Sequence, residues 1–301
     1  MRRKIHYFRI DLDEAIPEES RRPFGDTLKF INDLSTQDRT LQYQGLQEDS
    51  VRMMQVRHTG DHYRGIIAKY RSDSTITGSL NDDALVDLAL DEDVKIVEIT
   101  HFVYFTATRI LAVEYNQSGP REGTIRWYIN GILSRQESDP PAYTSMPVFH
   151  PDVITKLASA REIKILELEL PKERVTALAD GNNFFSALDA ASHIGNTGRV
   201  GLTLSGSKKK GDRTPLMSGS QLVHDIRAGE IDLSYFGKVI AVAAFESGTD
   251  VVNLLENRIS SVVSIVGPLT TSRETEWFDK IVSNYQSNRQ LLLSAASDEQ
   301  A

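Results

Sequence analysis

The stretch from Lys95 to Leu133 constrains the fold of this chain more than any other. Residues 95–106 alternate and then fill with β-branched and aromatic side chains, and residues 109–115 repeat that composition. The two runs predict strands joined by a short turn. Residues 116–120 follow as a loop, and apolar side chains at helical spacing predict a helix capped by Thr124. A hairpin followed by a helix that packs on it indicates a domain that mixes strands and helices.

The segments before this stretch continue the same pattern. Residues 4–12 alternate and predict a first strand, and residues 24–34 carry apolar side chains at the spacing of a helix. Residues 41–70 predict a strand pair or meander around a turn at His58 to His62. Residues 81–90 predict a short helix with acids in its first turn, where the helix dipole favours them.

A proline-rich segment, residues 138–151, has little periodicity and predicts a linker. The chain is thereby divided into an N-terminal domain, residues 1–137, and a C-terminal domain, residues 152–301. The expected fold class is α+β, with two domains that each hold a mixed or antiparallel sheet with packed helices, and a long C-terminal helix. The elements expected after the linker are a helix at 152–159, strands at 163–170 and 200–204, a helical region at 171–194, a helix at 218–227, a strand pair formed by 238–245 and 253–266, and a helix at 272–293. Residues 253–257 fit a helix equally well.

Composition excludes several kinds of chemistry. The chain of 301 residues has no cysteine, so thiolate nucleophiles, disulfides, iron–sulfur clusters and thiolate zinc sites are excluded. No apolar run is long enough to cross a bilayer, and the first residues lead into a strand, so we expect a cytoplasmic protein. The segment Ser205-Gly-Ser-Lys208 lacks the spacing of a phosphate loop, and the acidic run at 82–93 lacks that of a metal loop. We therefore expect neither a cofactor nor a bound metal.

The net charge of −8 argues against a protein that coats nucleic acid with its whole surface, but basic residues are concentrated in three segments. Lysine and arginine in such segments bind phosphates without reading bases, although solvated strands and loops carry the same residues. A protein that binds the phosphates of nucleic acid would use the N-terminus, the exposed face of the strands at 41–70 and a glycine-flanked tip at 205–213. The candidate residues are Arg2, Arg3, Lys4, Arg52, Arg57, Arg64, Lys208, Lys209, Lys210 and Arg213.

One short pattern points to catalysis instead. Pro151-Asp152, followed after a gap by Glu162-Ile163-Lys164, matches the arrangement of metal-dependent nucleases. In that chemistry Asp152 and Glu162 hold Mg²⁺ and Lys164 orients the attacking water. The same residues also fit a structural interpretation, because Asp152 after proline is an ordinary helix cap and alternating surface strands commonly carry Glu and Lys.

The order of the parts resembles the RexA-type phage-exclusion proteins. The likeness lies in the hairpin and loop that end at Asn116 to Pro120, in Asp152-Val153, and in the strand Ile163 to Pro171 that runs into a helix. The closing strands and long helix are also similar. This resemblance implies a cytoplasmic, dimeric defence protein that binds DNA with little sequence preference, sometimes beside a membrane-embedded partner protein. It implies no catalytic residues.

Three hypotheses therefore remain open. The first is a non-enzymatic protein of antiphage defence that binds the backbone of DNA. The second is a Mg²⁺-dependent nuclease that uses Asp152, Glu162 and Lys164. The third is a protein-interaction module that does not bind nucleic acid, for which the acidic surface and the helix with Trp277 supply contacts.

Overall fold

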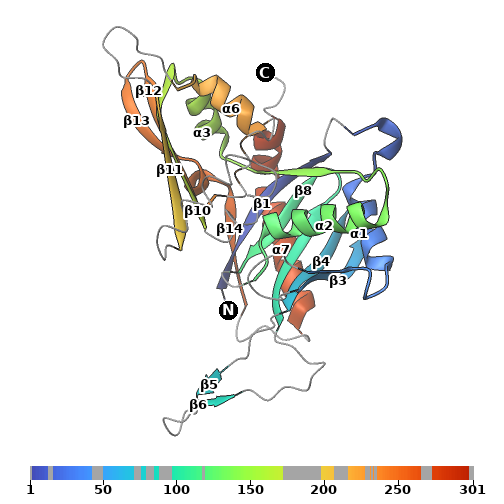
Figure 1. Ribbon diagram of the computed structural model, residues 1–301. Coiled ribbons are helices and arrows are strands. Elements are labelled where there is room, and N and C mark those ends of the chain that lie inside the picture. The colour runs from blue at the N-terminus through green and yellow to red at the C-terminus, as the bar shows by residue number, and fades with distance from the viewer. Residues whose placement is uncertain are drawn as a thin grey trace.

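The computed structural model describes most of the chain, and its fold is α+β (Figure 1). The described residues form a larger antiparallel sheet of eight strands, a smaller antiparallel sheet of four strands and a two-stranded ribbon. The fold class predicted from the sequence is confirmed. The described residues are 2–12, 16–42, 50–70, 76–78, 85–87, 97–116, 119–171, 198–206, 216–227, 231, 233, 236–265 and 273–297.

The first strand organises the larger sheet. β1 pairs along one edge with β8, and its other edge is shared by two strands: β14 pairs with residues 2–6 and β9 with residues 8–12. Beyond β8 the sheet continues in the order β7, β4, β3 and β2. The bounds are β1 Arg2–Leu12, β2 Thr40–Gln42, β3 Ser50–Thr59, β4 His62–Tyr70, β7 Val97–Phe105, β8 Ile110–Tyr115, β9 Tyr143–Pro147 and β14 Ser260–Ser264.

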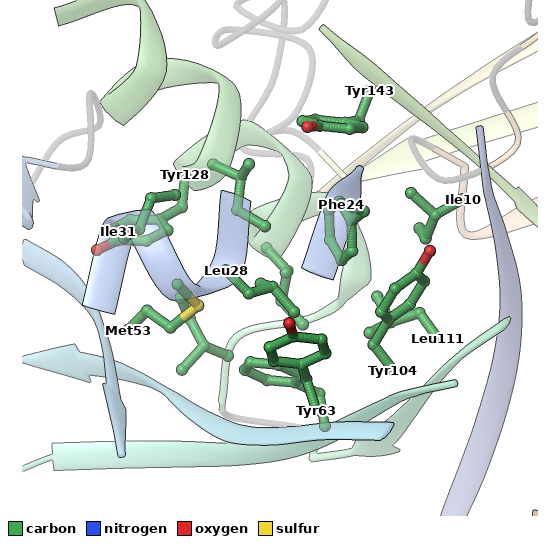
Figure 2. Close-up of a cluster of buried hydrophobic side chains, with 14 of the residues drawn as sticks. Ile10, Phe24, Leu28, Ile31, Met53, Tyr63, Tyr104, Leu111, Tyr128 and Tyr143 are labelled. Atoms are coloured by element: carbon green, nitrogen blue, oxygen red, sulfur yellow. The ribbon is translucent and has the colours of Figure 1, made fainter. Parts of the chain in front are cut away.

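Helices cover both faces of this sheet. α1 (Phe24–Asp33) and α2 (Glu122–Gln136) pack on one face, around a core that Figure 2 shows. The opposite face carries α7 (Glu274–Ser297), whose Trp277, Ile281 and Tyr285 are buried against the strands. The ring of Tyr285 stacks on that of Phe105 with centroids 3.4 Å apart. The larger sheet is therefore the middle of three layers.

The smaller sheet has helices on one face among the described residues. Its strands lie in the order β11 (Arg199–Ser205), β10 (Glu162–Pro171), β12 (Lys238–Phe245) and β13 (Gly248–Asn253). α3 (Pro151–Ala158) and α6 (Gly219–Arg227) pack on each other and on this sheet. A Cβ at Gly219 would lie 1.9 Å from the carbonyl oxygen of Leu157, so glycine is required where α6 meets α3.

The smaller sheet is inserted between two neighbouring strands of the larger one. The chain leaves the larger sheet after β9 and returns to it as β14. The outgoing and returning segments are hydrogen-bonded to each other: the amide of Ile259 donates to the carbonyl of Val148 (2.7 Å). The amide of Val148 in turn donates to Tyr7 in the middle of β1 (2.9 Å). These two segments form a junction between the sheets.

The sheets therefore divide the chain differently from the predicted domains, 1–137 and 152–301. Residues 143–147, inside the predicted linker 138–151, form β9 of the larger sheet. The last strand and the last helix also belong to the larger sheet, because β14 pairs with β1 and α7 packs on its face. The prediction that residues 253–266 pair with residues 238–245 is wrong, because β12 pairs with β13 and β14 pairs with β1. The alternative of a helix at 253–257 agrees with the short 3₁₀ helix that residues 255–257 form.

Other local predictions can be compared with the structure directly. The central hairpin, the first strand and helix, and the long C-terminal helix are confirmed. Within the predicted helix 81–90, Leu85–Asp87 instead forms strand β6, paired with β5 (Ile76–Gly78). α2 begins at Glu122, before Thr124, with Arg121 as its N-cap residue. The predicted helical region at 171–194 lies almost wholly outside the described residues.

In the part of the chain that the structure describes, no helix is both long and apolar enough to cross a membrane.

Candidate functional site

The three predicted basic residues of β1 lie on different faces of the larger sheet. Side chains alternate along a strand, so Arg2 and Lys4 share a face with His6, while Arg3 points to the α7 face. Arg3 is engaged there: its Nε lies 3.4 Å from Glu114 Oε1, and its guanidinium donates to Asn116 Oδ1 (3.0 Å). Arg2 and Lys4 are exposed. Only these two of the three are free to bind a ligand on the α2 side.

The second group of predicted residues is Arg52, Arg57 and Arg64, and two of them, Arg52 and Arg64, contact aromatic rings. Arg52 lies over the ring of Tyr70 at 4.6 Å from its centroid and donates to the hydroxyl of the same residue. Arg64 lies over Phe278 of α7 at 5.4 Å. Arg57 is exposed and stands directly opposite Arg64. Because two strands separate β1 from β4 and three separate it from β3, the two groups are about 14 to 19 Å apart across the sheet. They do not form one patch.

The third predicted group, Lys208, Lys209, Lys210 and Arg213, lies outside the described residues.

The predicted nuclease residues do not converge. Asp152 is in the first turn of α3, on the helix-covered face of the smaller sheet. Ile163 points into the core beneath the helices, so Glu162 and Lys164 on either side of it point to the other face. A bulge in β10 follows Ile163, and Lys164 donates to Thr249 Oγ1 (2.7 Å). Within the described residues, no group of three His, Asp or Glu side chains is placed to hold a metal ion.

A cavity of about 130 Å³, the junction cavity, lies where the inserted unit joins the larger sheet. Its walls come from β1 and β8, from the start of α2, and from Leu233, Phe236, Gly237, Leu255 and Arg258 of the inserted unit. The volume is enough for roughly four water molecules or one small anion. The polar residues that line it on the α2 side are His6, Tyr115, Arg121, Glu122 and Arg258, while Glu114 also borders it although its carboxylate lies on the α7 face with Arg3.

Two arginines that the sequence analysis did not single out give the junction cavity its charge. Arg121 lies over the ring of Tyr115 at 5.1 Å, and Tyr115 in turn contacts the ring of His6. Burial lowers the pKa of Arg258, and the nearby charge of Arg121 lowers it further. The carboxylate of Glu122 opposes this effect on Arg258 and also accepts a hydrogen bond from the Ser145 hydroxyl.

The pKa of His6 responds to the charges around the cavity. His6 is 7% exposed, and within the described chain no hydrogen bond involves its ring nitrogens. Its pKa is lowered from 6.5 to about 3, first by burial and then by the charges of Arg258, Lys4 and Arg121. A buried, neutral imidazole surrounded by three cations indicates a positive potential inside the cavity.

The start of α2 adds to this potential. Glu122 and Gly123, the first two residues of the helix, line the cavity, and no side chain caps the helix there. A helix N-terminus carries a partial positive charge and unpaired amide groups, which favour a bound anion. The arrangement can hold a phosphate or another small anion. The Gly-Pro-Arg-Glu-Gly sequence at 119–123 signals a helix start, but nothing in the sequence connects it with Arg258 or with Lys4.

Comparisons of the chain with known protein families and with curated proteins find no match.

Proposed function

We propose that this protein binds the sugar–phosphate backbone of DNA without reading bases, through Arg2, Lys4, Arg121 and Arg258, which we call the junction cluster. The observation that carries the proposal is geometric: Arg121 and Arg258 line one cavity together with His6, and Arg2 and Lys4 lie on the same face of β1 as His6. Charges gathered this closely attract phosphates, and the uncapped start of α2 offers amide donors to one of them.

The acidic net charge of −8 is compatible with this proposal because a local group of basic residues can bind phosphates although the chain as a whole is acidic. On the α2 side of the junction, Lys4, Arg121 and Arg258 act on His6, with Glu122 as the opposing carboxylate that acts on Arg258. Backbone contacts position a protein on DNA but carry no sequence information, so the expected binding is non-specific.

The resemblance to RexA-type phage-exclusion proteins supports a role in antiphage defence. On the same ground we propose a homodimer and a membrane-embedded partner protein of the same defence system. The geometry of Asp152, Glu162 and Lys164 does not favour the nuclease hypothesis, since these side chains lie on opposite faces of the smaller sheet.

The direct test measures binding to a fluorescent DNA duplex at low salt, with Mg²⁺ present, for the wild type and for the double variant Arg121→Gln/Arg258→Gln. Two lost phosphate contacts should weaken binding by roughly tenfold or more. The matched control is Arg161→Gln/Arg199→Gln, which removes two exposed arginines of the inserted unit and should bind as the wild type does.

Equal affinity of the wild type and the junction variant would contradict the proposal. Cleavage of the DNA that Glu162→Gln abolishes would establish the nuclease instead. No binding at low salt by a folded wild type would leave the protein-interaction module.

A further inference from the structure

A second pocket lies at the other end of β1, on the face covered by α1. Its volume is about 620 Å³, which is in the range of small-molecule sites. Ile10 and Leu12 of β1 line it, together with the start of α1 and the turn that joins β7 to β8. Four aromatic residues are among those that line it. We call it the tyrosine pocket. The four aromatic residues are Phe24, Tyr63, Tyr104 and Tyr143.

Two hydroxyl groups in the tyrosine pocket have no partner within the described chain. Tyr63 and Tyr104 are 8% and 4% exposed, yet no hydrogen bond joins either hydroxyl to another described residue. Neither oxygen is sealed from the pocket, because neither is among the buried side-chain atoms without a partner. Tyr143 differs, since its hydroxyl donates to the carbonyl of Arg22 (2.7 Å) and lies 2.5 Å from Thr27 Oγ1.

A hydroxyl that opens into a pocket binds water there or a ligand that replaces the water. Tyr63 and Tyr104 are direct cross-strand partners on β4 and β7, so both rings rise from the same face of the sheet. Figure 2 shows them on either side of Phe24, with their hydroxyls directed away from the strands. Burial raises the pKa of Tyr104 to about 12 and also raises that of Tyr63. Both phenols therefore stay protonated at neutral pH and can donate a hydrogen bond.

The charged residues that line the pocket balance one another, since three are acidic (Asp11, Glu18 and Asp26) and three are basic (Arg21, Arg22 and Arg109). Arg109 lies 2.7 Å from Asp11, and Arg22 lies 2.8 Å from Glu137. The interior accordingly offers aromatic surface and two free hydroxyls rather than net charge. Aromatic walls favour a flat ring, and free phenols favour carbonyl or ring-nitrogen acceptors on it.

We propose that the tyrosine pocket binds a small, uncharged heteroaromatic molecule of nucleoside size, held between aromatic rings and hydrogen-bonded by Tyr63 and Tyr104. This site is separate from the junction cluster: it lies around Ile10 to Leu12, whereas the cluster surrounds Arg2 to His6. Binding here does not depend on binding of DNA.

The test titrates the purified full chain with adenosine, guanosine, cytidine and uridine by saturation-transfer NMR and calorimetry, with myo-inositol as a non-aromatic control. At least one nucleoside should bind saturably and myo-inositol should not. The double variant Tyr63→Phe/Tyr104→Phe keeps both rings and removes both hydroxyls, so the affinity should fall roughly tenfold or more. Tyr285→Phe, which removes a hydroxyl bonded to Thr108 on the opposite face, should bind as the wild type does.

The melting temperature without ligand supplies a second measurement. Loss of two unpartnered hydroxyls should leave it unchanged or raise it. A clear fall, or failure of the double variant to fold, would show that the hydroxyls have partners within the protein and would overturn the proposal. Absence of nucleoside binding to the wild type, or unchanged binding by the double variant, would overturn it as well.

Discussion

His6 illustrates at the scale of one residue how surroundings determine a charge state. An exposed imidazole titrates near pH 6.5, but burial and the charges of Arg258, Lys4 and Arg121 lower the pKa of His6 to about 3. The folded protein therefore holds this ring neutral across the range in which the unfolded chain protonates it. This difference couples the stability of the fold to pH.

Stability should fall as the pH drops below 6.5, because only the unfolded state then gains a proton at His6. The contribution of His6 is complete above that pH and is lost progressively toward pH 3, by roughly 1 kcal/mol for each pH unit. Urea unfolding between pH 7.5 and 4.5 measures it. The variant His6→Gln lacks the titrating group and should show the smaller loss; parallel losses in the two proteins would contradict the assignment.

Arg3 shows what sequence patterns left undetermined at this scale. The alternation of β1 places Arg3 on the face opposite Arg2 and Lys4, but composition alone grouped all three as phosphate ligands. The buried carboxylate of Glu114, which holds Arg3, also accepts a hydrogen bond from His101 Nδ1 (2.7 Å). His101 is fully buried, and its Nδ1 is satisfied by this bond while its Nε2 has no hydrogen-bond partner among the described residues. Its partner on a neighbouring strand could not be identified without the register of the sheet.

At the scale of elements, the spacing of apolar residues predicts the helix α7 but not the sheet on which it packs. The sequence predicts a helix at 272–293, and in the structure Trp277, Ile281 and Tyr285 form its buried face. Tyr285 is hydrogen-bonded to Thr108, 177 residues earlier, so the surface that covers this face comes from a distant part of the chain. Hydrophobic periodicity reports which face of a helix is buried but not what covers it, because any apolar surface satisfies the pattern.

Because one face of α7 is buried, shortening a side chain on that face should cost more stability than shortening an exposed one. Ile281→Ala removes a side chain that is fully buried against the larger sheet, so it should lower the free energy of unfolding by roughly 2–5 kcal/mol. Leu293→Ala, on the same helix but 37% exposed, should cost less than about 1 kcal/mol. Chemical unfolding of both variants measures the difference. Similar losses would contradict the packing of α7 on the sheet.

At the scale of the whole molecule, the inserted unit explains why the junction cavity could not be predicted. Its walls come from segments around residues 6, 121 and 258, which meet only because the chain leaves and re-enters the larger sheet opposite Tyr7. Prolines at 138–151 suggested a linker, but a strand lies within that segment. The residues that set the charge of the cavity carry no local signal, since an isolated arginine beside a helix or strand is ordinary.

The salt dependence of DNA binding tests the junction cluster most directly. If Arg2, Lys4, Arg121 and Arg258 each neutralise one phosphate, the logarithm of the association constant should fall against the logarithm of salt concentration with a slope of roughly −3 to −4. Arg121→Gln/Arg258→Gln should flatten that slope by about 2. The same slope in the variant and the wild type, or a slope near zero for the wild type, would contradict binding of the backbone by this cluster.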